Sequence, residues 1–100
     1  MSLNLENLFS VKGKVGVVTG GSRGIGEMIA SGFLANKAKV YITARKEEAL
    51  LEKAKELSEK FGTDCIPFVS DLSSLDGIKT FKAFIQSNEP SGIDFLINNA

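Results

Sequence analysis

Histidine is absent from this 100-residue sequence, and cysteine occurs only once, at Cys65. Without histidine the chain lacks the commonest metal ligand and the commonest general base, so catalysis would need other groups. A single cysteine excludes an internal disulfide and is typical of a reducing compartment. Because Cys65 opens an apolar run, we interpret it as a core residue, with a redox-sensing role as the alternative.

Net charge and long apolar runs are also missing. Twelve Lys and Arg balance twelve Asp and Glu, which gives no indication of a nucleic-acid or anionic-membrane partner. No apolar run approaches the roughly 18 residues of a membrane span, and the first residues lack the pattern of a secretory signal. We therefore expect one cytoplasmic domain over residues 1–100.

Short apolar runs rich in Val, Ile and Phe alternate with helical patterns along the whole chain. The apolar runs are Lys14–Thr19, Lys39–Thr43, Cys65–Val69 and Asp94–Asn98. The helical patterns are Gly24–Ala35, Lys46–Phe61 and Leu75–Asn88. Nearly continuous apolar runs are typical of strands buried on both faces of a parallel sheet, and such strands are joined by right-handed helical crossovers. The sequence thus predicts an α/β fold with an open parallel sheet.

Helical spacing also predicts which faces are buried. In the first helix the apolar face consists of Ile25, Met28, Ile29 and Phe33. Gly62 follows the second helix, where a glycine commonly ends a helix in the left-handed conformation.

A cluster of glycines, Gly20, Gly21, Gly24 and Gly26, separates the first predicted strand from the first helix. Bare backbone and the positive end of a helix dipole together form an anion site that suits a pyrophosphate. The spacing G-x-x-x-G-x-G differs from the usual dinucleotide fingerprint, and no Lys-Ser/Thr pair follows, which excludes a P-loop. The alternative is a turn that only lets the strand and helix pack closely.

Three motifs give the sequence a family resemblance. The stretch TGGSRGIG, from Thr19 to Gly26, is similar to the T-G-x-x-x-G-I-G signature of the short-chain dehydrogenase/reductase family. Asp71-Leu72 after the third predicted strand and Asn98-Asn99-Ala100 at the end of the fourth resemble two further motifs of that family. The resemblance implies a Rossmann-type doubly wound sheet of strand order 3-2-1-4. Residues 1–100 would be its N-terminal, cofactor-binding part, truncated after the fourth strand.

The resemblance also implies roles for individual residues. The pyrophosphate and the adjoining ribose would lie against the backbone of Gly20, Ser22, Gly24, Ile25 and Gly26. Asp71 would accept a hydrogen bond from the adenine amino group, beside the backbone of Leu72. Asn98 and Ala100 would line the middle of the cofactor, while Asn99 would support the sheet.

Simpler interpretations of these polar residues stay open. Asp71 lies in a stretch rich in helix-capping residues, in which Ser73 and Asp76 fit a capping box. The pair Asn98-Asn99 could be a polar turn that ends a strand. We favour the adenine role for Asp71 because Ser73 is available as the cap.

Two arginines indicate which nicotinamide cofactor the site takes. An NAD site places an acid near the end of the second strand to bind the ribose 2′-hydroxyl, but here Ala44 stands in that place. Arg45 follows it, and Arg23 precedes Gly24, so both could pair with the 2′-phosphate of NADP. The alternative is that both arginines are solvated surface residues.

Catalytic residues are not assigned. The family uses a Tyr-x-x-x-Lys pair that follows the Asn-Asn-Ala motif, whereas the only tyrosine, Tyr41, lies inside the second predicted strand. We therefore expect the 100-residue chain to be inactive by itself.

The resemblance implies an NADP-dependent oxidoreductase of the carbonyl reductase or alcohol dehydrogenase type, with features of 3-oxoacyl reductases. The complete enzyme would act on a small carbonyl or alcohol substrate and form a homo-oligomer. The alternative is a short, non-catalytic nucleotide-binding or interaction chain.

Overall fold

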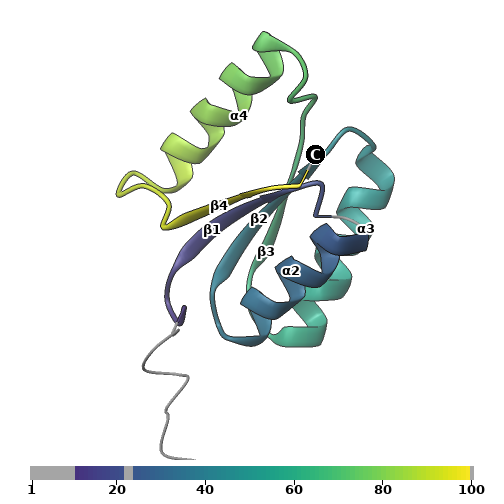
Figure 1. The fold of residues 1–100 in the computed structure, drawn as a ribbon, viewed down its shortest axis with the longest axis vertical. Coiled ribbons are helices and arrows are strands. Elements are labelled where there is room, and N and C mark those ends of the chain that lie inside the picture. Colours follow the sequence, from purple (N-terminus) through teal and green to yellow (C-terminus); the bar gives the residue numbers. More distant parts are fainter. Residues whose placement is uncertain (1–10, 22–23, 100) are drawn as a thin grey trace, which may run out of the picture.

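Four parallel strands form one sheet in the order β3-β2-β1-β4, as Figure 1 shows for the computed structural model, which describes residues 11–21 and 24–99. The strands are β1 (Val15–Thr19), β2 (Lys39–Ala44), β3 (Cys65–Val69) and β4 (Phe95–Asn98). The helices are α2 (Gly24–Ala35), α3 (Glu47–Phe61) and α4 (Leu75–Asn88). The predicted α/β class and strand order are confirmed, and the predicted bounds differ by at most one residue at each end.

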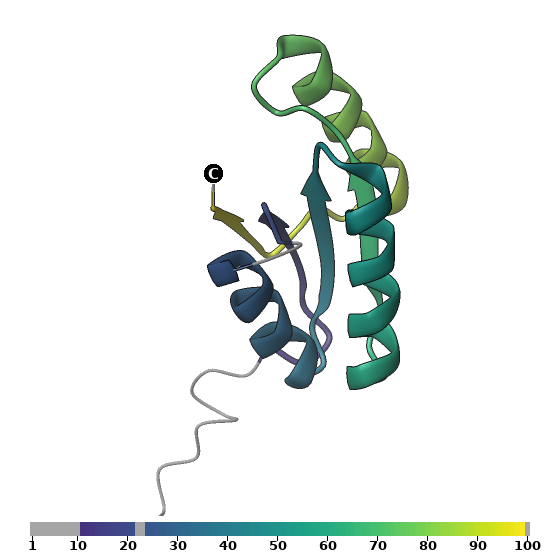
Figure 2. The same ribbon diagram turned by 90° about the vertical axis from the view of Figure 1, so that its right-hand side faces the viewer.

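The core lies between the sheet and the helices α2 and α3, which cover the same face (Figure 2). Residues from β1 and β2 pack there against the inner faces of both helices. The buried residues of this cluster are Val18, Ala30, Leu34, Val40, Ile42, Leu50, Ala54, Leu57 and Cys65. Burial raises the pKa of the Cys65 thiol to about 12, so at neutral pH this side chain is a protonated core residue rather than a reactive thiolate.

The buried face of α2 agrees only in part with the predicted one. Ile29 and Phe33 pack against the core as partly buried residues, as predicted. Gly26, Ala30 and Leu34 face the sheet, whereas Ile25 and Met28 are 62% and 67% exposed. Small residues at Gly26 and Ala30 let the helix backbone approach the strands closely, and that contact outweighs the burial of two larger side chains. Helix α3 behaves as expected, because Gly62 ends it with φ 64° and donates its N–H to the Ser58 carbonyl.

Helix α4 lies alone on the opposite face of the sheet (Figure 1). Phe84 stacks on Phe68 of β3 with a centroid distance of 4.4 Å, and its ring meets Tyr41 of β2 edge to face. At the end of the helix, Glu89 accepts hydrogen bonds from Lys39 Nζ and Tyr41 Oη, each at 2.6 Å. These contacts attach α4 to β2 and β3, yet no residue of α4 is fully buried.

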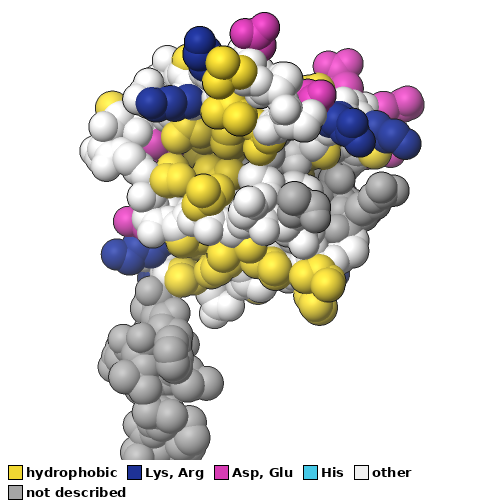
Figure 3. Space-filling model, turned by 45° about the horizontal axis from the view of Figure 1, so that its top comes forward, with side chains coloured by type: hydrophobic (Ala, Val, Ile, Leu, Met, Phe, Trp, Pro, Cys, Tyr) yellow, Lys and Arg dark blue, Asp and Glu magenta, His cyan; other side chains and the backbone are white. Residues whose placement is uncertain are grey.

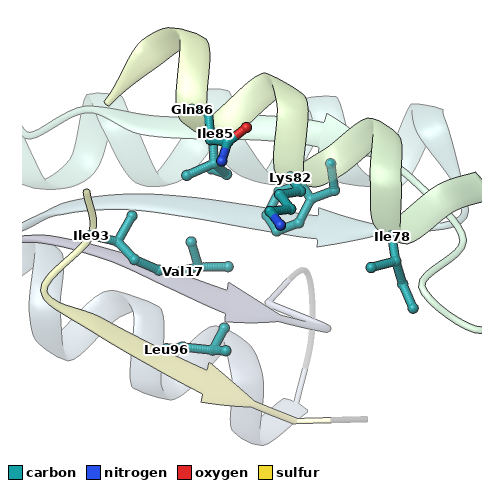
Figure 4. A pocket seen from close by; sticks show the side chains of 8 residues that line it. Val17, Ile78, Lys82, Ile85, Gln86, Ile93 and Leu96 are labelled. Carbon is teal, nitrogen blue, oxygen red and sulfur yellow. The ribbon is translucent and has the colours of Figure 1, made fainter. Parts of the chain in front are cut away.

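An apolar groove of about 310 Å³ remains between α4 and the strands β1 and β4. Figure 4 shows Val17 and Leu96 on the sheet side, with Ile78 and Ile85 on the helix side. Leu96 is 58% exposed. Figure 3 shows a face of the molecule on which hydrophobic side chains gather near the middle. One face of the sheet is thus only partly covered by the described residues.

Helices of the described part of the chain are too short and too polar to cross a membrane.

Candidate functional site

The carboxyl ends of β1, β2, β3 and β4 meet at one edge of the sheet, because all four strands are parallel. Gly20 follows β1, Arg45 follows β2 and Asp71 comes two residues after β3. Asn98 is the last residue of β4. The fold therefore brings together four segments that are far apart in the sequence, at the edge where open α/β sheets bind ligands.

The turn after β1 is built on close backbone approaches. Gly20 and Gly24 adopt φ of 66° and 61°, a left-handed conformation that glycine accepts without strain. A Cβ on Gly26 would overlap the Gly20 carbonyl oxygen and approach Asn99 Nδ2. The first turn of α2 therefore rests directly on the backbone of the turn, with its N-terminus at the sheet edge. Ile25 exposes its side chain beside this turn.

Thr19 joins the glycine turn to β4. Its buried hydroxyl donates to Asn98 Oδ1 at 3.0 Å and accepts from the Asn99 N–H at 2.8 Å. The Gly20 N–H donates to the Thr43 carbonyl at 2.9 Å, so the start of the turn is fixed to β2 as well. The prediction of site residues did not include Thr19; the available signal was a polar residue at the end of an apolar strand.

Asp71 is held by the two serines that follow Leu72. Its Oδ1 accepts the Ser73 hydroxyl at 2.5 Å and the Ser73 N–H at 3.0 Å, and its carbonyl accepts the Ser74 hydroxyl at 3.1 Å. The Ser73 hydroxyl, then the Ser73 N–H, and more weakly the charge of Arg45, hold the pKa of Asp71 below its ordinary value. Asp71 is therefore an exposed carboxylate with Arg45 nearby.

The cap of α4 corrects one interpretation. Ser74, rather than Ser73, is the N-cap, and its hydroxyl accepts the Gly77 N–H at 3.0 Å. The capping box between Ser73 and Asp76 does not form, because Ser73 instead donates to Asp71. The N-cap of α4 is therefore provided by Ser74 and not by the Asp71 carboxylate.

The end of β2 has a basic surface. Ala44 is the last residue of the strand, and the exposed Arg45 and Lys46 follow it. Lys46 occupies the N-cap of α3 with an extended backbone and no side-chain cap. Glu47 and Glu48, in the first turn, suit the positive end of the helix dipole. Because β2 ends in Ala44 and not in an acidic residue, no carboxylate at this position repels an anion bound to Arg45.

The partly buried polar cluster of Lys39, Tyr41 and Glu89 lies at the other end of the strands, because Lys39 is the first residue of β2. Burial, and secondarily the hydrogen bond to Glu89, raises the pKa of Tyr41. The hydrogen bonds from Lys39 and Tyr41 lower the pKa of Glu89. Tyr41 thus anchors α4 and does not face the glycine turn. Among residues 11–21 and 24–99, no group of three His, Cys, Asp or Glu side chains could hold a metal ion.

The structure brings most of the predicted site residues to one sheet edge: Gly20, Gly24, Ile25, Gly26, Arg45, Asp71, Leu72 and Asn98. Ser22, Arg23 and Ala100 lie outside the described residues. The glycine turn, its helix N-terminus and the basic end of β2 form a surface suited to an extended anion.

Comparisons of sequence identify related proteins over nearly the whole chain. The pattern of the short chain dehydrogenase family matches residues 14–100. A rhamnolipid-biosynthesis 3-oxoacyl-[acyl-carrier-protein] reductase of Pseudomonas aeruginosa is 44% identical over 92% of this chain and 35% of its own length. An NADPH-dependent 1-acyldihydroxyacetone phosphate reductase of Saccharomyces cerevisiae is 39% identical, over 96% of this chain and 32% of its own. The chain thus spans about a third of the length of these curated relatives.

Solved structures agree with these sequence relatives. L-sorbose reductase of Gluconobacter frateurii, complexed with NADPH and L-sorbose, matches with a TM-score of 0.86 and 37% identity. The match covers 91% of this chain and 34% of that one. The NADP complex of Pseudomonas aeruginosa RhlG matches with a TM-score of 0.85 and 42% identity, over 92% of this chain and 36% of that one.

Proposed function

Because this chain belongs to the short-chain dehydrogenase/reductase family of oxidoreductases, we propose that it carries the NADP(H)-binding part of a carbonyl reductase or alcohol dehydrogenase. One observation supports this most strongly: the glycine turn, Arg45, Asp71 and Asn98 lie at one sheet edge. Relatives that bind NADPH or NADP support the choice of cofactor.

The proposed binding mode follows the sheet edge. The pyrophosphate would lie at the N-terminus of α2, against the backbone at Gly20, Gly24, Ile25 and Gly26, together with Ser22. Exposed N–H groups and the helix dipole stabilise negative charge there. Bound NADPH would supply the hydride for the reaction.

The remaining polar groups would orient the two ends of the cofactor. Asp71 would accept from the adenine amino group, beside Leu72. Asn98 and Ala100 would line the middle of the cofactor, and Asn99, whose N–H is fixed by Thr19, would hold the turn in place.

Arg45 would select the phosphorylated cofactor. Its guanidinium can pair with a 2′-phosphate through two hydrogen bonds, and Ala44 removes the carboxylate that would repel this phosphate. Arg23 would be the second cation of the same site.

The chemical step is proposed to need residues that this chain does not carry. Tyr41, the only tyrosine, is buried and donates to Glu89 at the opposite end of the strands. We therefore expect NADPH binding without turnover from the 100 residues alone. A small carbonyl compound is the proposed substrate, in line with relatives named as reductases of a 3-oxoacyl carrier protein and of L-sorbose.

The test is a fluorescence titration of this chain with NADPH and NADH, before and after Arg45→Asp. We expect NADPH to bind more tightly than NADH, and the variant to weaken NADPH binding by roughly 10-fold to 100-fold, because a charge-assisted hydrogen bond is worth about 1.5–3 kcal/mol. NADH binding should change little.

Lys55→Asp is the matched control, since Lys55 is an exposed cation on α3, outside the site. It makes the same change of charge and should leave the preference for NADPH intact. Equal loss in both variants, or no change in the NADPH-to-NADH ratio with Arg45→Asp, would contradict the proposed role of Arg45.

A further inference from the structure

Gly77 lies in the first turn of α4, directly against the backbone of Asp71. A Cβ built on Gly77 would overlap the Asp71 carbonyl oxygen and come within 3.0 Å of Ser74 Oγ. A backbone carbonyl cannot rotate away like a flexible side chain. Any residue larger than glycine would therefore push the Asp71 backbone out of its present position.

Ser74 also binds the Asp71 carbonyl oxygen. Both the Ser74 N–H, at 3.2 Å, and the Ser74 hydroxyl, at 3.1 Å, donate to the Asp71 oxygen. The Ser74 hydroxyl in turn accepts the Gly77 N–H at 3.0 Å. Asp71, Ser74 and Gly77 are therefore linked by hydrogen bonds, and the missing side chain at Gly77 leaves room for the Asp71 carbonyl.

The carboxylate of Asp71 is oriented within this arrangement. The two hydrogen bonds from Ser73 both go to Oδ1. None of the described residues donates a hydrogen bond to the second oxygen, Oδ2, so this oxygen is available to another donor. A shift of the Asp71 backbone would move the carboxylate and its Ser73 contacts together.

Glycine inside a helix lowers stability relative to alanine, so its presence needs a local reason. Gly32 in α2 provides the comparison. It is exposed, and a Cβ on it would meet nothing within 4 Å. A Cβ would therefore have room at Gly32, whereas at Gly77 it would collide with the site residue Asp71.

We infer that Gly77 is a positioning residue, which keeps the first turn of α4 close enough to Asp71 for its carboxylate to recognise the amino group of adenine. This inference rests on the proposed cofactor site, and it adds a residue that does not itself touch the cofactor. According to this inference, recognition of the adenine base depends on the position of the first turn of α4.

The experiment compares the binding of NADP with that of its hypoxanthine analogue, which has a carbonyl oxygen in place of the adenine amino group. Both ligands are titrated against the full 100-residue chain by competition with NADPH fluorescence. The wild type should prefer NADP by about tenfold, because the analogue replaces a donor with an acceptor facing a carboxylate. Gly77→Ala should bring this ratio close to one.

Gly32→Ala is the matched control and should keep the wild-type ratio. Should Gly77→Ala lose its helical circular dichroism, Ser73→Ala replaces it. This second variant removes the hydroxyl on Oδ1 without adding an atom, and it should reduce the ratio by about threefold, within the range of one hydrogen bond.

The outcomes separate the inference from the proposed function. A wild type that binds NADPH but does not distinguish the two bases would overturn the adenine role of Asp71, and the inference with it. A wild type that distinguishes them while folded Gly77→Ala keeps the full ratio would overturn the inference alone. Failure of the wild type to bind NADPH would overturn the proposed function.

Discussion

The Thr19 hydroxyl connects two strand ends with a single oxygen. It donates to Asn98 Oδ1 and accepts the Asn99 N–H, so it ties the end of β1 to the end of β4 and the residue that follows. A buried hydroxyl that makes two hydrogen bonds contributes to the free energy of unfolding, because its loss leaves neighbouring buried polar groups without a partner.

We expect Thr19→Val to lower the free energy of unfolding by about 1–3 kcal/mol, the usual cost of leaving a buried donor unsatisfied. Valine has nearly the same shape, so packing in β1 is kept. Urea denaturation measures the loss, and NADPH titration should show weaker binding because the glycine turn loses its link to β4.

Thr80→Val provides the comparison for this change. Thr80 is exposed on α4, and its hydroxyl donates to the Asp76 carbonyl at 2.8 Å. Its effect should stay within about 0.5 kcal/mol, as for most surface substitutions. Similar losses from both variants would mean that the Thr19 hydroxyl has no special role.

At the scale of elements, the sequence predicted the strands better than the buried face of α2. Four apolar runs and right-handed crossovers were enough for the strands, and the family resemblance added their order. In α2 the prediction was wrong at Ile25 and Met28 because it followed large side chains, whereas Gly26 and Ala30 allow closer packing. Side-chain size alone does not reveal which face of a helix packs closely against the backbone of the sheet.

The family resemblance assigned roles to Asp71 and Asn98, and the absence of an acid at Ala44 indicated Arg45. The parallel strands then place these three residues at one edge of the sheet. Thr19 and Gly77 could not be found in this way. Their roles depend on side-chain and backbone contacts that become visible only when the turn after β3 and the end of β4 are placed.

Helix α4 is attached to the sheet through Phe84 and through Glu89 at its C-terminal end, and Glu89 makes the polar part of this attachment. Glu89→Ala should lower the free energy of unfolding at neutral pH by about 1–3 kcal/mol, since the Tyr41 hydroxyl loses its acceptor in a largely buried site. Glu52→Ala on the exposed side of α3 is the control and should change stability by less than about 0.5 kcal/mol.

The contribution of Glu89 should also depend on pH. Because its pKa is lower in the folded state than the ordinary 4.5, the stabilisation is fully present above that value. It should disappear as the pH falls through the lowered folded-state pKa. Urea denaturation between pH 7 and pH 3 should therefore show the wild type and Glu89→Ala converging in acid; a constant difference would contradict the role of the Glu89 charge.

At the scale of the whole molecule, the two edges of the sheet are unequal. The β3 edge carries Pro67, which has no N–H to offer a further strand. The β4 edge has no proline and lies next to the groove with the exposed Leu96. Self-association should therefore start at β4, where free backbone groups and apolar surface coincide.

We expect Leu96→Lys to reduce the concentration-dependent association of this chain, because it places a charge at the centre of that surface. Sedimentation or light scattering over a range of concentrations measures this. Leu51→Lys is the control, since Leu51 is 47% exposed on α3, on the other side of the sheet. Equal effects of both variants would show that general solubility, and not the β4 edge, is responsible.

The hydrogen bond from Thr19 to Asn98 connects residues that are 79 positions apart in the chain. The pairings of β1 with β2 and of β2 with β3 join residues 24 and 25 positions apart, so they close shorter loops, at a lower cost in entropy, than the pairing of β4 with β1. We expect the end of β4 to pair with β1 beside the glycine turn only after the strands and helices between them have formed. Competence to hold a nucleotide would therefore be the last property that this part of the protein acquires as it folds.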